Sequence, residues 1–363
     1  MSSIPSFTEK LPTTHTAIGL NPTVSTSASG EVHELRSIRT ITSKRAGDVN
    51  YIDARAANGD TELLAEIGYK QELDRHFSTA QVFGIAFSIM GLLPSIASIL
   101  PIALSGGTVS FIWGWLLSGA FILSIGASMS ELASAIPTSG GLYYYAYHYA
   151  PPKYKAFLSF LIGNSNTLAL AAGLCAVDYG LAGEILSIVV MSKDGDFEIT
   201  DGMMYGVYAA CIIATAVVVS GATVAVSKLQ NFSIISNMSL ILFFLIVLPI
   251  GVSRSKDVDF NTGKFMFSYW ENESNWPSGW QFMMAGFQPA VWVIGAFDSC
   301  IHMSEEAKNA TKAVPIGILT SISMCWIIGF CICIAIAACM GTDIKSILNT
   351  NYGQPLAQIL YNA

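Results

Sequence analysis

Residues 81–104 read QVFGIAFSIMGLLPSIASILPIAL, a stretch with no charged residue. A helix of about 20 apolar residues crosses the hydrocarbon core of a bilayer, so the stretch is long enough to span a membrane. It is poorly suited to one uninterrupted helix, because Gly91 and Pro94 lie close together near its middle. Glycine weakens a helix, and proline lacks the backbone N–H and disfavours helical geometry at the residue before it. The stretch therefore predicts a membrane helix with a break.

A break inside a membrane leaves backbone groups that need partners. A freed N–H or C=O is costly in hydrocarbon, so we expect the break to face protein or a water-filled cavity. There the amides of Leu92, Leu93 and Ser95 would bind an anion such as a carboxylate, helped by the positive end of the following half-helix. The alternative is an ordinary kinked membrane helix, and this stretch alone does not decide between the two.

Composition places the whole chain in the same class. Of 363 residues, 52% are hydrophobic and 12% are charged, and the mean hydropathy is +0.52. A soluble domain carries about 25% charged residues, so the long apolar runs predict an all-α polytopic membrane protein. The net charge of −7 argues against nucleic-acid binding. The cysteines fall in or beside apolar runs without a CxxC spacing, so we interpret them as small hydrophobes and expect no metal site.

Residues 1–76 form a polar tail, which we expect to be mostly disordered and cytoplasmic, with helical character from Asn50 to Gln71. The first 30 residues lack the apolar core of a cleavable signal peptide. Residues 77–363 form the membrane core. Seven apolar spans are predicted, at about 79–104, 108–133, 156–191, 203–225, 230–252, 279–302 and 315–340.

Basic residues set the expected orientation. The tail holds eight Lys or Arg residues, while the loops between spans divide five inside and five outside when the tail is cytoplasmic. A glycosylation motif at Asn272 then lies in an outer loop, which makes Asn272 a glycosylation candidate. Further matches to that motif lie in spans or on the inner side, at Asn231, Asn237 and Asn309.

The sixth span is interrupted in the same way as the first. It carries Gly286, Pro289 and Gly295, followed by Asp298. A pair of interrupted spans is the best sequence indication of a secondary transporter with inverted repeats and a site at the membrane midplane. Spans one and six are equivalent if the repeat unit has five helices.

Three stretches carry a resemblance to a known family. They are FGIAFSIMGLLPSIAS, SELASAIPTSGGLYYYAYHYAPPKY and PAVWVIGAFDSCIHMSEEAKNATKAVPIGI, which begin at Phe83, Ser130 and Pro289. The sequence resembles the amino acid–polyamine–organocation (APC) transporter superfamily, and within it the fungal GABA permeases. The resemblance implies an inverted-repeat fold with discontinuous helices 1 and 6 and about ten to twelve spans. The chain ends where an eighth span would begin, so we expect a truncated chain whose second repeat is incomplete.

The resemblance also assigns roles to residues at the two breaks. The backbone amides of 91–97 would cradle a substrate carboxylate, and the carbonyls at 295–297 would receive the substrate amine, with Phe297 as a gate and Asp298 beside it. The implied substrate-binding residues are Gly91, Leu92, Leu93, Pro94, Ser95, Ile96, Ala97, Gly295, Ala296, Phe297 and Asp298.

Ionisable residues in or beside the spans are the candidates for gating or proton coupling, because a charge at membrane depth is costly and usually functional. Some proton-coupled relatives carry a lysine in the middle of span five. This chain has Asn237 there, so another group must titrate if protons drive uptake. Besides Asp298, the gating or coupling candidates are Glu131, Asp178, Glu305 and Glu306.

Together these features predict a transporter and no enzyme, since no Walker A, HExxH or Ser/His/Asp arrangement is present and no cofactor is implied. The resemblance implies GABA, related ω-amino acids or putrescine as substrate and the proton gradient as energy source, in the plasma or vacuolar membrane. Leu92, Leu93 and Pro94 occupy the positions of a Gly-Ser-Gly motif in relatives that transport α-amino acids. The replacement of these small residues favours a substrate whose amine and carboxylate are widely spaced. The alternatives are a choline or other cationic-nutrient transporter and a non-transporting nutrient sensor.

Overall fold

The computed structural model describes residues 38–42, 49–53, 60, 75–193, 195–221, 223–256 and 258–363, with the backbone alone at 38–42, 49–53, 221 and 223–228. The chain divides into two units, Met1–Glu72 and Leu73–Ala363. In the first unit, strand β1 (Ile38–Thr42) pairs antiparallel with strand β2 (Val49–Asp53). The sequence predicted no strand there, and the helical character expected from Asn50 is wrong for the first residues of that stretch. The disorder expected at 1–37 lies outside the described residues.

The second unit is helical, and its long apolar helices match the predicted spans. The described residues hold seven helices long and apolar enough to cross a membrane, so the number of spans is confirmed and the chain is a multi-pass membrane protein. Their limits differ from the predicted ones by up to five residues. The spans are Thr79–Leu104, Gly107–Ala135, Lys155–Met191, Asp201–Ser220, Leu229–Arg254, Phe282–His302 and Ala310–Cys339.

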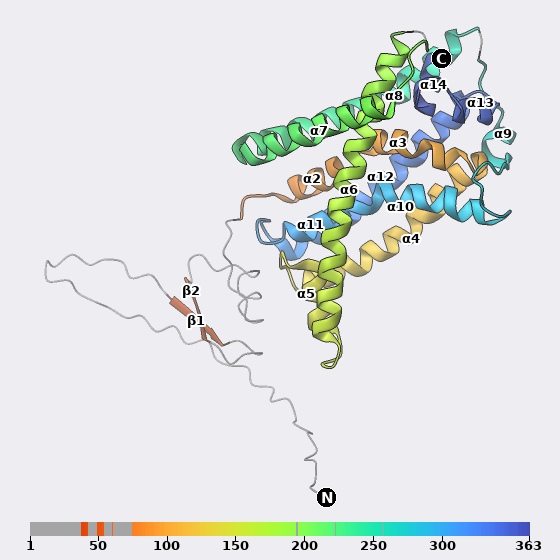
Figure 1. Cartoon of the computed structure of the whole chain (residues 1–363). Coiled ribbons are helices and arrows are strands. Elements are labelled where there is room, and N and C mark those ends of the chain that lie inside the picture. Colours follow the sequence, from red (N-terminus) through yellow and green to blue (C-terminus); the bar gives the residue numbers. More distant parts are fainter. Residues whose placement is uncertain are drawn as a thin grey trace, which may run out of the picture. The chain divides into compact units, whose positions relative to one another are not determined.

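Figure 1 labels the helices that make up these spans and the shorter helices between them. Span one consists of α2 (Thr79–Met90) and α3 (Leu92–Leu104), and spans two to five are α4 (Gly107–Ala135), α6 (Lys155–Met191), α7 (Asp201–Gly221) and α8 (Thr223–Arg254). Span six is a series of four elements: η1 (Phe282–Phe287), α10 (Gln288–Ile294), η2 (Gly295–Asp298) and α11 (Ser299–His302). Span seven is α12 (Ala310–Cys339), and the short helices are α5 (Gly141–Tyr149), α9 (Gly263–Ser268), α13 (Ile344–Leu348) and α14 (Pro355–Asn362).

Helices α4 and α12 form the centre of the unit and run antiparallel. Ser134 near the end of α4 donates its hydroxyl to the carbonyl of Thr311 at the start of α12 (2.9 Å). Further along, the Trp115 indole donates to the Trp326 carbonyl (3.0 Å), and the Trp326 indole donates to the Leu116 carbonyl (3.0 Å). The two tryptophans thus bridge the same pair of helices in opposite directions.

Glycines make room for both indoles. A Cβ on Gly119 would lie 2.0 Å from Trp326, and a Cβ on Gly329 would lie 2.1 Å from Trp115. Each tryptophan therefore fills the space that a missing side chain leaves on the facing helix, and small residues let two helices approach closely inside a membrane.

The two interrupted spans lie beside each other and against this centre. Helix α2 packs against η2, and α3 packs against α10. The two halves of span one follow each other along one general direction (Figure 1). By contrast, helix α7 buries none of its most apolar window in the protein, as expected for a helix that faces lipid.

Candidate functional site

The break in span one lies at Gly91. Helix α2 ends at Met90, and Gly91 has φ 49° and ψ 54°, the left-handed region that glycine adopts at little cost. The sequence position of Pro94 suggested that this proline contributes to the break. In the structure Pro94 is the third residue of α3 and ends neither helix. In the first turn of a helix the N–H groups have no intrahelical acceptor, so the missing N–H of proline costs nothing there.

The start of α3 offers two backbone amides. The Gly91 N–H donates to the Ser88 carbonyl (3.2 Å) and the Ser95 N–H donates to the Gly91 carbonyl (2.9 Å). The expectation of a free Ser95 amide is therefore wrong, and the Ser95 hydroxyl is also engaged, on the Met90 carbonyl (2.8 Å). Because Pro94 has no N–H, the amides of Leu92 and Leu93 are the first-turn donors without an intrahelical acceptor.

The break in span six lies at Gly295–Asp298, as predicted. These residues form a short 3₁₀ segment, within which Ala296 has non-helical angles (φ −86°, ψ 18°). The carbonyl of Ala296 accepts from both the backbone N–H and the hydroxyl of Ser299, the latter at 2.7 Å. Since a carbonyl oxygen has two lone pairs, that of Ala296 is fully used in this conformation. Phe297 is buried, whereas Asp298 is half-buried.

A cavity of about 410 Å³ borders the α3 side of the first break. Leu93, Pro94 and Ala97 line it, together with residues of α6, α8 and α14. Its walls are mostly apolar, and its polar side chains include Glu184 of α6 and Gln354. Ligand sites commonly combine apolar walls with a few polar groups.

Two polar side chains in the spans each bury an oxygen atom that has no hydrogen-bond partner. Asp178 of α6 is 3% exposed, and its Oδ2 atom is buried without a hydrogen-bond partner. Asn237 of α8 is 9% exposed, and its Oδ1 atom is likewise buried and unpaired. Buried polar groups without partners are rare, which makes both positions candidates for a role beyond packing.

The remaining predicted ionisable residues lie near one end of the bundle. The Glu305 carboxylate, 3% exposed, accepts from the Ser139 backbone N–H at 3.1 Å and from the Ser139 hydroxyl. The Glu306 carbonyl accepts from the backbone N–H groups of His76 (2.7 Å) and Phe77 (2.9 Å). Glu131 is exposed and forms no ion pair with a Lys or Arg in the part of the chain that the structure describes.

Other hydrogen bonds complete this inner cluster, by which we mean residues 75–78, 138–141 and 302–308. The Arg75 guanidinium donates to the Ala307 carbonyl (2.7 Å), and the Lys308 N–H donates to the Phe77 carbonyl (2.8 Å). The His302 Nδ1 donates to the Ser139 carbonyl (3.0 Å), while its Nε2 is buried and unpaired. Three segments far apart in the sequence therefore close this end of the bundle.

Comparison with known proteins identifies the family. The amino acid permease profile matches residues 77–363, a range that includes all seven spans found in the described residues. The chain belongs to the amino acid permease family. It is 55% identical over 329 residues to a GABA-specific permease of Saccharomyces cerevisiae, an alignment that covers 91% of this chain and 57% of that protein.

More distant relatives agree with this assignment. An uncharacterized amino-acid permease of Schizosaccharomyces pombe is 37% identical over 317 residues, covering 87% of this chain and 58% of the relative. An amino-acid permease of Arabidopsis thaliana is 31% identical over 310 residues, covering 83% and 59%. The chain therefore spans less than two thirds of the length of these relatives. Their names describe permeases and not enzymes, and they lend no support to putrescine.

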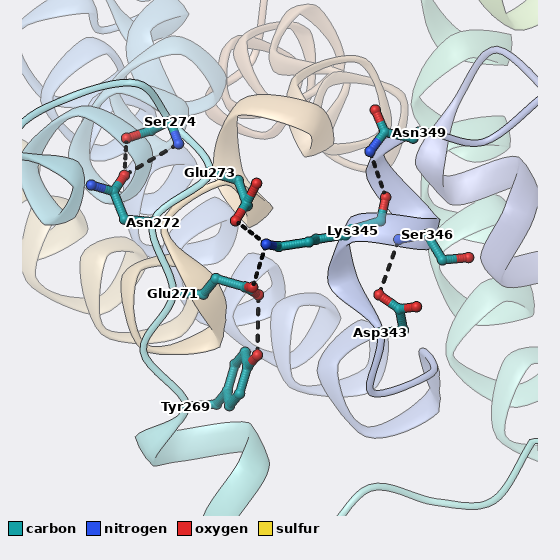
Figure 2. A network of polar contacts seen from close by, with 9 residues as sticks. All are labelled: Tyr269, Glu271, Asn272, Glu273, Ser274, Asp343, Lys345, Ser346 and Asn349. Atoms are coloured by element: carbon teal, nitrogen blue, oxygen red, sulfur yellow. Dashed lines mark hydrogen bonds and ion pairs between the residues drawn. The ribbon is translucent and has the colours of Figure 1, made fainter.

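At the opposite end of the helical unit, a second polar network joins the loop before span six to α13. The Lys345 ammonium lies 3.0 Å from the Glu273 carboxylate and 4.0 Å from that of Glu271 (Figure 2). The Tyr269 hydroxyl donates to Glu271 (3.1 Å). Glu273 raises the pKa of Lys345, and desolvation together with the hydrogen bond to Glu271 raises that of Tyr269. We call these four residues the outer network.

Sequence reasoning missed Ser139, Arg75 and the outer network. The sequence did contain an indication that Ser139 donates hydrogen bonds, because the PTSGG sequence at 137–141 is typical of a turn, which supplies backbone and hydroxyl donors. No local pattern pointed to the partner of Lys345, because Glu273 lies more than 70 residues earlier in the chain.

Proposed function

We propose that this chain forms the substrate-binding part of a secondary transporter for GABA. The observation that carries the proposal is the pair of helix breaks, at Gly91 and at Gly295–Asp298, in two spans that pack against each other. Breaks in corresponding spans favour the inverted-repeat fold, with the second repeat incomplete in this chain. The 55% identity to a GABA-specific permease supports GABA as the substrate.

The two breaks suit the two ends of a zwitterion. We place the carboxylate at the amides of Leu92 and Leu93, where the positive end of α3 adds to the attraction. We place the amine at span six, with the Asp298 carboxylate as its counter-charge. We choose Asp298 and not the Ala296 carbonyl as the partner of the substrate amine, because Ser299 already occupies both lone pairs of that carbonyl. Phe297 then closes over the ligand.

Proton coupling has two carboxylates within the spans available, one buried and one half-buried. Asp178 and Asp298 lie within spans, whereas Asn237 supplies no titratable group at the position where some relatives carry a lysine. We assign the inner cluster, with Glu305 and Glu306, to a gate on the cytoplasmic side, and Glu131 to its rim. The tail is then cytoplasmic, and the protein resides in the plasma or vacuolar membrane.

The test is uptake of labelled GABA by transport-deficient yeast. Two proteins are compared: this chain, and a chimera in which the remaining part of the Saccharomyces cerevisiae GABA-specific permease follows Ala363. We expect saturable uptake by the chimera, stronger at acidic external pH and abolished by a protonophore. Asp298→Asn should abolish it, whereas Asp196→Asn, at an exposed loop position, should leave it unchanged.

Competitors separate this proposal from its alternatives. Excess GABA should block uptake, and leucine and putrescine should not. Block by choline instead would favour a cationic-nutrient transporter. Saturable GABA binding without uptake by a chimera that reaches the membrane would favour a sensor, and absence of both would refute the proposal.

A further inference from the structure

The structure separates the four N-glycosylation motifs of this chain by their surroundings. Asn231 lies inside the fifth span, two residues after its first residue Leu229, and Asn237 is buried in the same span. The buried Asn237 has no room for a saccharide, and Asn231 belongs to a membrane span. Asn272 and Asn309 are both exposed and both lie outside the spans.

These two exposed motifs lie at opposite ends of the bundle. Asn309 directly precedes α12, which runs for 30 residues to Cys339. The loop that holds Asn272 is bound at the other end of α12, because Asn261 in the same inter-span segment donates to the Ala337 carbonyl (2.9 Å). A helix of that length spans about 45 Å, more than the thickness of the hydrocarbon core. One of the two motifs therefore faces the side where glycans are added, and the other does not.

The folded loop leaves Asn272 ready to carry a glycan. The Asn272 Oδ1 accepts from the Ser274 hydroxyl (2.6 Å) and backbone N–H (3.2 Å). The Nδ2 donates one hydrogen to the Trp276 carbonyl (2.7 Å). An amide nitrogen has two hydrogens, and glycosylation replaces one of them. Glycosylation leaves the Oδ1 free to accept both hydrogen bonds from Ser274 (Figure 2), and the modified nitrogen retains one hydrogen that can be donated.

We propose that Asn272 is N-glycosylated. The amide Nδ2 attacks C1 of a lipid-diphosphate-linked oligosaccharide, so that an N–C1 bond forms and the C1–O bond to the diphosphate breaks. The lipid diphosphate is the leaving group, and Nδ2 loses one proton. The proposal rests on the orientation given under the proposed function, with the tail in the cytosol, and not on the identity of the substrate.

Neighbouring contacts set a limit on where the saccharide lies. Glu273 follows Asn272 directly and holds Lys345 at 3.0 Å. The Asn272 side chain turns back on its own loop toward Ser274 and Trp276 instead of joining the outer network. The glycan therefore leaves the Glu273–Lys345 ion pair intact.

The experiment is expression of the 363-residue chain in yeast and digestion of the membrane-extracted protein with an endoglycosidase that cleaves N-glycans. We expect one downward shift in apparent mass for the wild-type chain and for Asn309→Gln, and no shift for Asn272→Gln. Ser274→Thr, which preserves the motif, should keep the shift, and Ser274→Ala should lose it. This pair keeps the test decisive if Asn272→Gln fails to fold.

Peptide mapping of the digested protein identifies the modified residue. A saccharide remnant on Asn272 supports the proposal. An unshifted wild-type chain, or a remnant on Asn309, overturns it. Neither result depends on GABA uptake, so a failure here is distinct from a failure of the proposed transport activity.

Discussion

Gly91 adopts a backbone conformation that an L-residue with a side chain reaches only at a cost. Its φ of 49° lies in the left-handed region, although a Cβ there would meet nothing closer than the Ser95 hydroxyl at 3.5 Å. The cost of Gly91→Ala is therefore conformational and not steric, about 1–2 kcal/mol. We expect a lower midpoint of thermal unfolding in detergent. Gly173→Ala is the control, since Gly173 is helical with nothing within 4 Å, and it should not lower the midpoint.

Glu305 and Glu306 differ in how they hold the inner cluster. The Glu305 carboxylate accepts both hydrogen bonds from Ser139, whereas the bonds from His76 and Phe77 reach only the backbone carbonyl of Glu306. Hydrogen bonds to a charged group contribute about 1.5–3 kcal/mol, so Glu305→Gln should loosen residues 136–141. Hydrogen exchange of that segment should rise in Glu305→Gln and stay unchanged in Glu306→Gln. Equal exchange in both variants would show that the carboxylate does not hold the loop.

At the scale of elements, the contact between α4 and α12 depends on the reciprocal placement of tryptophan and glycine. Gly119→Ala would put a Cβ 2.0 Å from Trp326, and Gly329→Ala would put one 2.1 Å from Trp115. Overpacking a tight interface costs about 1–3 kcal/mol, so each substitution should lower the unfolding midpoint. Gly206→Ala in α7, with nothing within 4 Å, is the matched control.

A double substitution tests whether the cost arises at this contact. Trp326→Ala removes the ring atoms that meet position 119, together with the indole hydrogen bond to the Leu116 carbonyl. Residues in direct contact couple energetically, so Gly119→Ala should cost less in the Trp326→Ala background than in the wild type. Additive costs would place the strain elsewhere.

The outer network predicts a loss of stability at alkaline pH. Lys345 donates a hydrogen bond to Glu273 and pairs with its charge, and both interactions raise the pKa of Lys345 above the ordinary value of about 10.4. A raised pKa in the folded state stabilises the fold fully below the unfolded-state pKa, and this contribution disappears as the pH rises through the folded-state pKa. The difference in unfolding midpoint between the wild type and Lys345→Gln should therefore become smaller above about pH 10.4. A difference independent of pH, or unaffected by salt, would exclude the ion pair as its source.

The sequence predicted these elements best where the signal is local. Residues 81–104 contain two helix breakers three residues apart, Gly91 and Pro94, and this local pattern predicted a break. The backbone conformation shows that the break is at Gly91 and that Pro94 fits the first turn of α3. The π-helical turn at Phe282–Phe287 had no such signal. Its Gly286 approaches Gly114 so closely that a Cβ on Gly114 would lie 2.3 Å away. Such a contact depends on residues about 170 positions apart, which periodicity along one helix cannot predict.

At the scale of the whole molecule, the two breaks and the two polar clusters have a common arrangement. The inner cluster closes the end of the bundle that includes Arg75, Ser139 and Glu305, and the outer network links the loop before span six to α13 at the other end. The broken spans lie between these ends. The proposed transport function requires the two ends to open in turn, and under that proposal the clusters hold each end closed while a ligand occupies the breaks.

The number of spans leads to a test of the orientation on which this arrangement depends. Seven crossings put the residues before Thr79 and the residues after Cys339 on opposite sides of the membrane. In intact cells we expect an epitope tag added before Met1 to be hidden from antibody, because basic residues in the tail favour the cytosol. For protein in the plasma membrane, a tag after Ala363 should be stained, and both tags should be stained after permeabilisation. Equal exposure of the two tags would mean an even number of crossings. If only the tag before Met1 were stained, the orientation would be reversed, and Asn309 instead of Asn272 would lie on the outside.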